Sequence, residues 1–92
     1  MSVAPAELAH ALGVGEGELL KEAMRSLLLE KKREVLQAKL EILARYGAKS
    51  LDDLETKIAE GDVAEHPAWE DLIVTENLNA RLGELDGYLR RV

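Results

Sequence analysis

The feature that most constrains this chain is a run from residue 18 to residue 46 that contains neither glycine nor proline. These twenty-nine residues are mostly Leu, Ala, Glu, Lys and Arg, which are strong helix formers. At about 1.5 Å per residue, the predicted helix is roughly 43 Å long. Arg45 lies in its last turn, where the helix dipole favours a cation, and Gly47 follows as a residue suited to a left-handed helix end. A helix of this length exceeds one small globule, so we expect it to serve two packing layers.

Apolar side chains on the predicted long helix fall into two stripes at helical spacing. The first stripe consists of Leu20, Met24, Leu27 and Leu28, and the second of Leu36, Leu40 and Leu43 with Ile42 alongside. Between the stripes, residues 30–34 are charged on every side of the helix. Because a helix that is polar all round usually crosses solvent, we expect residues 30–34 to bridge solvent between two contacts.

The composition is that of an all-α protein. Leu, Ala, Glu, Lys and Arg supply 54 of the 92 residues, whereas the strand formers Val, Ile and Thr supply 11 and Phe is absent. Pro5 and Pro67 favour helix starts, Ser50 is an expected N-cap, and Gly13 and Gly61 are expected helix stops. We therefore predict a short N-terminal helix and one long central helix. A short helix and a final helix then fold back on the C-terminal half of the long one.

The final predicted helix carries a nearly heptad apolar seam. Its members, at spacings of 4, 4, 3, 4 and 3, are Val74, Leu78, Leu82, Leu85, Leu89 and Val92. Such a seam suits packing against another helix, either the chain's own long helix or one from a partner. Trp69 lies at the acidic start of this helix, beside Glu70 and Asp71, and is either a core residue or a binding anchor.

Charge is distributed unevenly along the chain, whose formal net charge is -6. Residues 1–50 have a balance of +1, whereas residues 51–92 have a balance of -7. The overall acidity argues against nonspecific nucleic-acid binding, which needs a basic face to replace counterions. The acidic half is either a solvated surface or a surface that attracts a basic protein.

The sequence offers no residues in a pattern that supports catalysis or metal binding. There is no Cys, and His10 and His66 each lack a second His one helical turn away. The glycines at 13, 15 and 17 follow no strand and precede no Gly-Lys-Ser/Thr, so they do not form a phosphate loop. We therefore expect a non-enzymatic protein with no catalytic residue, no cofactor and no metal site. No apolar run is long enough to cross a membrane, and we expect a cytoplasmic location.

Two sets of side chains are candidates for interaction surfaces. The N-terminal third has more large apolar side chains than one short helix can cover, which predicts a partner, and the simplest partner is a second copy. The predicted dimer interface is Leu20, Met24, Leu27 and Leu28. The predicted partner-binding residues are Trp69, Glu70, Asp71, Ile73, Leu78, Leu82, Leu85 and Leu89.

Two stretches resemble a known class of protein. Pro5-Ala-Glu-Leu-Ala-His-Ala-Leu-Gly-Val14, with Glu18-Leu-Leu-Lys-Glu-Ala-Met-Arg-Ser-Leu-Leu-Leu29, resembles the two helices of ribbon-helix-helix antitoxins. Ala44-Arg-Tyr-Gly47, Ser50-Leu-Asp-Asp-Leu54, Ile58-Ala-Glu-Gly61 and His66-Pro-Ala-Trp-Glu-Asp71 are similar to the C-terminal region of small prokaryotic antitoxins of type II toxin-antitoxin modules. The resemblance implies a dimerisation region over residues 1–46 and an acidic toxin-binding region over residues 47–92. The implied toxin is basic, commonly a ribonuclease.

Two alternatives remain beside the antitoxin hypothesis. One is a helical homo-oligomer or assembly subunit without any toxin. The other is a regulator that binds DNA through an N-terminal dimer. The small basic cluster Lys31, Lys32 and Arg33 is either a solvated helix surface or a contact with nucleic acid or an acidic partner. Ribbon-helix-helix proteins read the major groove with a paired β-ribbon, and residues 1–4 are short and carry no Lys or Arg. We therefore do not expect DNA recognition by that route.

Overall fold

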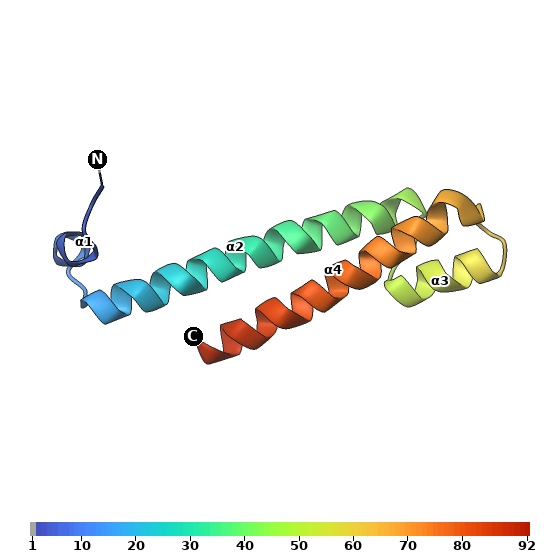
Figure 1. The fold of residues 1–92 in the computed structure, drawn as a ribbon. Helices are drawn as coiled ribbons and strands as arrows, with labels where there is room; N and C mark the ends of the chain where they lie inside the picture. Colours follow the sequence, from blue (N-terminus) through green and yellow to red (C-terminus); the bar gives the residue numbers. More distant parts are fainter. Residues whose placement is uncertain (1) are drawn as a thin grey trace.

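The computed structural model describes residues 2–92 and is built from helices alone (Figure 1). The four helices are α1 (Pro5–Leu12), α2 (Glu16–Arg45), α3 (Leu51–Ala59) and α4 (Glu65–Arg91). No strand occurs in the described part of the chain. The predicted all-α class and the order of short, long, short and final helix are therefore confirmed.

The body of the molecule is an antiparallel pair formed by α2 and α4 (Figure 1). The described chain as a whole, with α1, measures 60 × 28 × 16 Å. The fold-back is longer than predicted, because α4 runs past the C-terminal half of α2. Where the overlap of α4 with α2 ends, the Arg25 guanidinium of α2 donates a hydrogen bond to the backbone oxygen of Val92 at 2.8 Å. The first turns of α2 and all of α1 extend beyond this point (Figure 1).

The expectation that residues 30–34 cross solvent is wrong on the side that faces α4. The Lys32 ammonium lies 2.7 Å from a carboxylate oxygen of Asp86, and both side chains are about two-fifths exposed. A lysine can lay its aliphatic stem along a neighbouring helix while its charged end meets a carboxylate. A fully polar segment therefore continues the helix pair instead of leaving it.

Local signals in the sequence set the ends of the helices. The Ser50 hydroxyl accepts a hydrogen bond from the Asp53 amide at 3.0 Å, which confirms the predicted N-cap. The Asp53 carboxylate in turn accepts from the Lys49 amide, one residue earlier than in a standard capping box. Gly47 has a positive φ of 62°, and the amides of Gly47 and Ala48 close the last turn of α2 on carbonyls of that turn.

The hydrophobic core lies at the end of the hairpin where α3 packs. Its fully or nearly fully buried members are Leu43 of α2, Leu54 and Ile58 of α3, and Ala68 and Leu72 of α4. Thr75, one turn further along α4, is also buried and satisfies its hydroxyl by donating to the carbonyl oxygen of Asp71 at 2.8 Å. The α3 helix thus locks the turn between the two long helices.

The opposite end of the hairpin has little core. There, α1 packs only on the beginning of α2, and its one buried residue is Ala9. The link between the two helices turns at Gly13, whose φ is 71°, and the Val14 amide donates to the carbonyl oxygen of Ala9 at 3.0 Å. The molecule is therefore well packed at one end and open at the other.

Removing a core side chain at the α3 end should destabilise the whole fold. We expect Leu54→Ala to lower the free energy of unfolding by about 2–5 kcal/mol, because Leu54 is fully buried and its loss leaves a cavity. Urea denaturation followed by circular dichroism measures the change. The matched control is Ile73→Ala, whose side chain is 57% exposed and whose effect should stay within about 0.5 kcal/mol. Equal losses in both variants would contradict this position for the core.

Candidate interaction surfaces

Large apolar side chains are exposed along the hairpin and at both of its ends. They are Val3, Leu8, Leu12, Leu20, Met24, Leu27, Leu29, Leu36, Leu40, Trp69, Ile73, Val74 and Tyr88. A single exposed leucine needs no explanation, whereas a contiguous apolar patch usually marks a contact with another molecule. Two groups of these residues form surfaces of different character.

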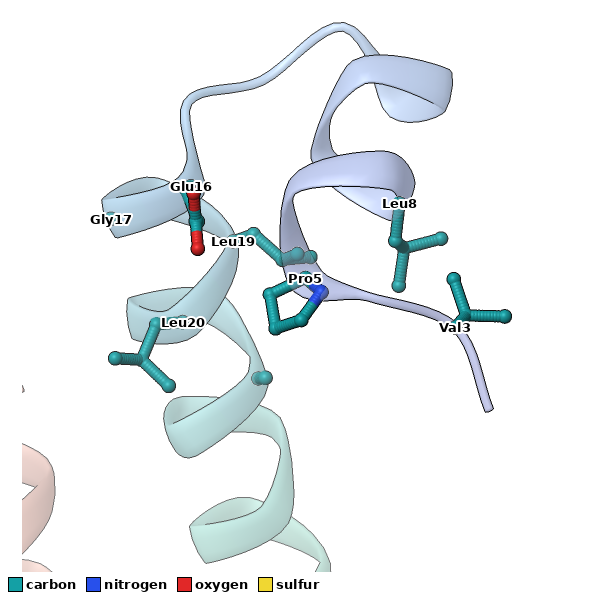
Figure 2. Close-up of a pocket in the computed structure, with 8 residues that line it drawn as sticks. Val3, Pro5, Leu8, Glu16, Gly17, Leu19 and Leu20 are labelled. Atoms are coloured by element: carbon teal, nitrogen blue, oxygen red, sulfur yellow. The ribbon is translucent and has the colours of Figure 1, made fainter. Parts of the chain in front are cut away.

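The first group surrounds the junction of α1, the start of α2 and the end of α4. We call it the N-terminal apolar surface, and it consists of Val3, Leu8, Leu20, Met24, Leu27 and Tyr88. Between α1 and α2 it opens into a hollow of about 530 Å³ whose lining is mostly apolar. Figure 2 shows Val3 and Leu8 side by side on the α1 side of this hollow, with Leu19 pointing from α2 toward Pro5.

A second hollow, of about 320 Å³, continues the N-terminal apolar surface toward the chain end. It lies between α2 and the last turns of α4 and is lined by Met24, Leu27, Leu28, Tyr88 and Val92. The four residues predicted as a dimer interface therefore lie on one side of α2. Three of them are exposed, while Leu28 is half-buried.

Sequence reasoning did not include Val3, Leu8 or Tyr88 in this surface. Tyr88 joins it because α4 returns as far as Arg25, and the helical period alone does not give that length of overlap. Val3 and Leu8 join it because α1 folds across the start of α2. The apolar character of these residues was visible, but their position depended on tertiary structure.

The second group lies at the other end of the hairpin, among carboxylates. We call residues 51–76 the acidic end, because this stretch has nine acidic side chains and one basic side chain. Trp69 and Ile73, one helical turn apart on α4, are 42% and 57% exposed there. Glu70 between them is exposed as well. The exposed apolar side chains of Trp69 and Ile73 therefore lie among negatively charged residues.

Asp71 differs from its neighbours because it is engaged within the chain. Its carboxylate accepts a hydrogen bond from the Tyr46 hydroxyl and lies 3.6 Å from the Arg45 guanidinium. The hydrogen bond to this carboxylate raises the pKa of Tyr46, and partial burial and the negative charge of Asp71 act in the same direction. Of the predicted partner-binding residues, Asp71 thus joins the end of α2 to α4.

Glu70 makes a local contact on the exposed side of α4. Its carboxylate lies 2.9 Å from Nδ1 of His66, one turn earlier. A backbone hydrogen bond at the helix start lowers the pKa of Glu70, and the hydrogen bond to His66 lowers it further. Glu70 therefore keeps its negative charge to lower pH than an isolated glutamate.

The leucine seam of α4 packs mainly within the chain. Leu85 is 4% exposed, and Leu78, Leu82 and Leu89 are half-buried. They share the side of α4 that holds the buried Thr75 and runs along α2. Of the eight predicted partner-binding residues, the structure leaves Trp69, Glu70 and Ile73 exposed together.

The described residues contain no group of three or more His, Asp and Glu side chains placed to hold a metal ion. None of the helices in residues 2–92 is both long and apolar enough to cross a bilayer. Residues 2–4, ahead of α1, form no strand.

The family described as "Uncharacterized protein MJ0235 family" matches the chain over residues 1–92. The chain belongs to this family. The match includes all four helices and therefore both surfaces. No curated protein and no solved structure matches the chain significantly.

The link between Tyr46 and Asp71 should be visible in the pH dependence of stability. Because folding raises the pKa of Tyr46 above its ordinary value of 10.0, its stabilising contribution is complete below pH 10 and is lost as pH rises through the folded-state pKa. We expect the free energy of unfolding of the wild type to fall in that alkaline range. Tyr46→Phe should cost about 1 kcal/mol near neutral pH and lose this part of the decline.

Urea unfolding at a series of pH values and one fixed protein concentration measures both effects. Tyr88→Phe is the matched control, because the Tyr88 ring is 52% exposed and makes no hydrogen bond through its hydroxyl to the described chain. If Tyr46→Phe and wild type decline in parallel above pH 10, the Tyr46–Asp71 contact does not contribute to folding.

Proposed function

We propose that this protein is an antitoxin-like interaction protein that binds a basic partner through its acidic end. The observation that carries the proposal is the exposure of Trp69 and Ile73 within a stretch that has nine acidic residues and one basic residue. Interfaces commonly combine a few large apolar anchors with a charged rim. In this proposal Trp69 and Ile73 are the anchors, and Glu70 belongs to the rim.

The charges of the acidic end suit a partner whose own surface is basic. Seven of its nine carboxylate side chains are exposed: Asp52, Glu55, Glu60, Asp62, Glu65, Glu70 and Glu76. Exposed charges of one sign speed the approach of an oppositely charged protein more than they strengthen the final complex. A nucleic-acid-cleaving toxin has a basic surface to hold its substrate, and the acidic end would cover that surface.

The proposal identifies the partner as a toxin encoded beside this protein and places both in the cytoplasm. The support is the resemblance of residues 44–71 to small antitoxins, together with the charge difference between the two halves of the chain. The protein acts as a dimer in this proposal, with the N-terminal half joining the copies and the C-terminal half holding the toxin. A helical assembly subunit without a toxin is the alternative that the exposed apolar side chains also support.

Substitutions at the acidic end should weaken the complex with the product of the adjacent gene. We expect Trp69→Ala and Ile73→Glu each to raise the Kd at least about thirtyfold, the size expected for an interface hot spot. Surface plasmon resonance with the full-length proteins measures the change. Leu29→Glu is the matched control, because Leu29 is 49% exposed but lies outside both surfaces, and it should bind as the wild type does.

Raising the salt concentration should distinguish the electrostatic part of the contact from its apolar part. From about 50 to 500 mM salt, we expect the association rate to fall steeply while dissociation changes little, because screening removes the steering and leaves the apolar contact. A complex abolished by salt would mean that Trp69 and Ile73 make no contact. No binding of the adjacent gene product at any salt concentration would reject the antitoxin proposal, and a gel shift with operator-length DNA would then support the regulator.

A further inference from the structure

We infer that the exposed side of α2 in its first half binds a second copy of this chain in antiparallel orientation, with the two-fold axis between Ala23 and Met24. The inference deepens the proposed function, in which the protein acts as a dimer, by assigning the surface, the direction and the pairing of residues. Four kinds of observation carry it: the exposed area, the spacing of one helix face, the charges at its ends and the hollow beside it.

The chain exposes more surface than a folded monomer of its size. The accessible area is 6637 Å², whereas a monomer of 10.2 kDa is expected to expose about 5,300 Å². The radius of gyration is 19.2 Å, against about 12 Å for a compact chain of this length. The excess of about 1,300 Å² is more than the roughly 800 Å² that each partner contributes to a standard interface.

One exposed face of α2 has a spacing that reads the same in both directions. Its members are Glu16, Leu20, Ala23, Met24, Leu27 and Lys31, and all six are exposed. The steps between them are 4, 3, 1, 3 and 4 residues. At 3.6 residues per turn, these positions fall within an arc of about 100°, so they form one continuous stripe. A symmetric stripe is what a helix needs to pair with a copy of itself that runs the opposite way.

Antiparallel pairing about the centre of this stripe places apolar side chains on apolar side chains. Leu20 meets the partner's Leu27, and Ala23 meets the partner's Met24. The two-fold axis repeats each contact, as an isologous interface requires. Small Ala23 opposite larger Met24 lets the helices approach closely at the centre.

The charged ends of the stripe select the antiparallel direction. In this register Glu16 faces the partner's Lys31, and the symmetry produces the pair twice. Lys31 has only an exposed contact within its own helix, 3.5 Å from Glu34, so its ammonium is available to a second carboxylate. A parallel dimer would instead set Glu16 against Glu16 and Lys31 against Lys31, and like charges at these positions repel.

The hollow between α1 and α2 fits the same arrangement. It lies beside residues 16–23 of α2, and antiparallel pairing brings residues 24–31 of the partner to that level. The partner's Leu27 then fills the apolar hollow, and the reverse contact follows by symmetry. The stripe residues at this end of α2 stay exposed beside α1, because α4 ends beside Arg25 and does not reach the first turns of α2 (Figure 1).

Charge reversal tests the register. Sedimentation equilibrium of the full-length wild type at micromolar concentration should give twice the 10.2 kDa mass of the chain. Glu16→Lys alone and Lys31→Glu alone should each weaken the dimer about tenfold, because each change replaces two attractive pairs by two repulsive ones. The double variant Glu16→Lys/Lys31→Glu should return to the wild-type dissociation constant. Glu22→Lys and Arg33→Glu, on the opposite side of α2, are matched controls and should dimerise normally.

An apolar pair of variants tests the surface independently of charge pairing. Leu27→Glu should weaken the dimer about a hundredfold or more, because it places an unpaired carboxylate in an apolar contact. Leu29→Glu is two positions away, about 200° around the helix, and is similarly exposed, at 49% against 57%. It should leave the dimer intact. Circular dichroism confirms that both variants remain helical.

Cysteine cross-linking tests the direction of the helices, since the natural sequence contains no Cys. A mixture of Leu20→Cys and Leu27→Cys chains should form the mixed disulfide dimer faster than either chain links to itself. A monomeric wild type overturns the inference, and so does a double charge reversal as weak as the single ones. Preferential self-linking of Leu20→Cys would show a parallel dimer and overturn the assigned direction.

These outcomes are separate from those that decide the proposed function. Self-association is measured without any partner, and Leu27→Glu lies far along the chain from Trp69 and Ile73. A wild-type protein that is monomeric but still binds the adjacent gene product would reject the inference alone. A dimer of the expected register that binds no such product would reject the toxin partner alone.

Discussion

The contact of α3 with the two long helices is the interaction on which the rest of the structure depends. Leu54 and Ile58 of α3 pack in one buried cluster with Leu43 of α2 and Leu72 of α4. Without α3 packed there, only the long, half-polar contact between α2 and α4 would fix the orientation of α4. With it, the turn after α2 is fixed, and every later contact follows from the antiparallel course of α4. The ion pair of Lys32 with Asp86 and the hydrogen bond from Arg25 to Val92 are such later contacts.

Because the core lies at the α3 end of the molecule, apolar side chains at the α1 end remain exposed. A chain of this size has too few apolar side chains to bury every helix face of a molecule 60 Å long. The apolar residues near the start of α2 are therefore left on the surface, where α1 shields only part of them. Acidic side chains gather instead around α3 and the start of α4, on the outside of the core. The two ends thus differ in chemistry because the same limited apolar content cannot serve both.

The sequence predicted the helices well because their limits depend on local chemistry. Ser50 and Gly47 act within a turn of their own position, and each lies at an observed helix end. Pro67 lies two residues inside α4, directly after His66, whose backbone departs from helical geometry. The length of the overlap between α4 and α2 is harder to predict from the sequence. Helical periodicity shows which face of a helix packs, but not how far that helix extends along its neighbour. For this reason the sequence does not predict Tyr88 and Val92 beside Met24, and it wrongly predicts residues 30–34 in solvent. Of the proposed partner contacts, Trp69 and Ile73 are exposed as the hypothesis requires. Leu85 is buried, because the same heptad spacing serves a helix within the chain as well as one outside it.

The placement of the core also has a consequence for how the isolated chain is degraded. Opening of a folded protein begins where few buried side chains must be exposed, and α1 buries only Ala9. Its connection to α2 runs through Gly13 and Gly15, which adds flexible backbone at the same place. Proteases should therefore first cut the isolated chain in this connection, while the segment from α3 to the middle of α4 persists. The lifetime of the protein in the cell would then depend on whether a second copy covers the N-terminal end, and not on the stability of the core around α3.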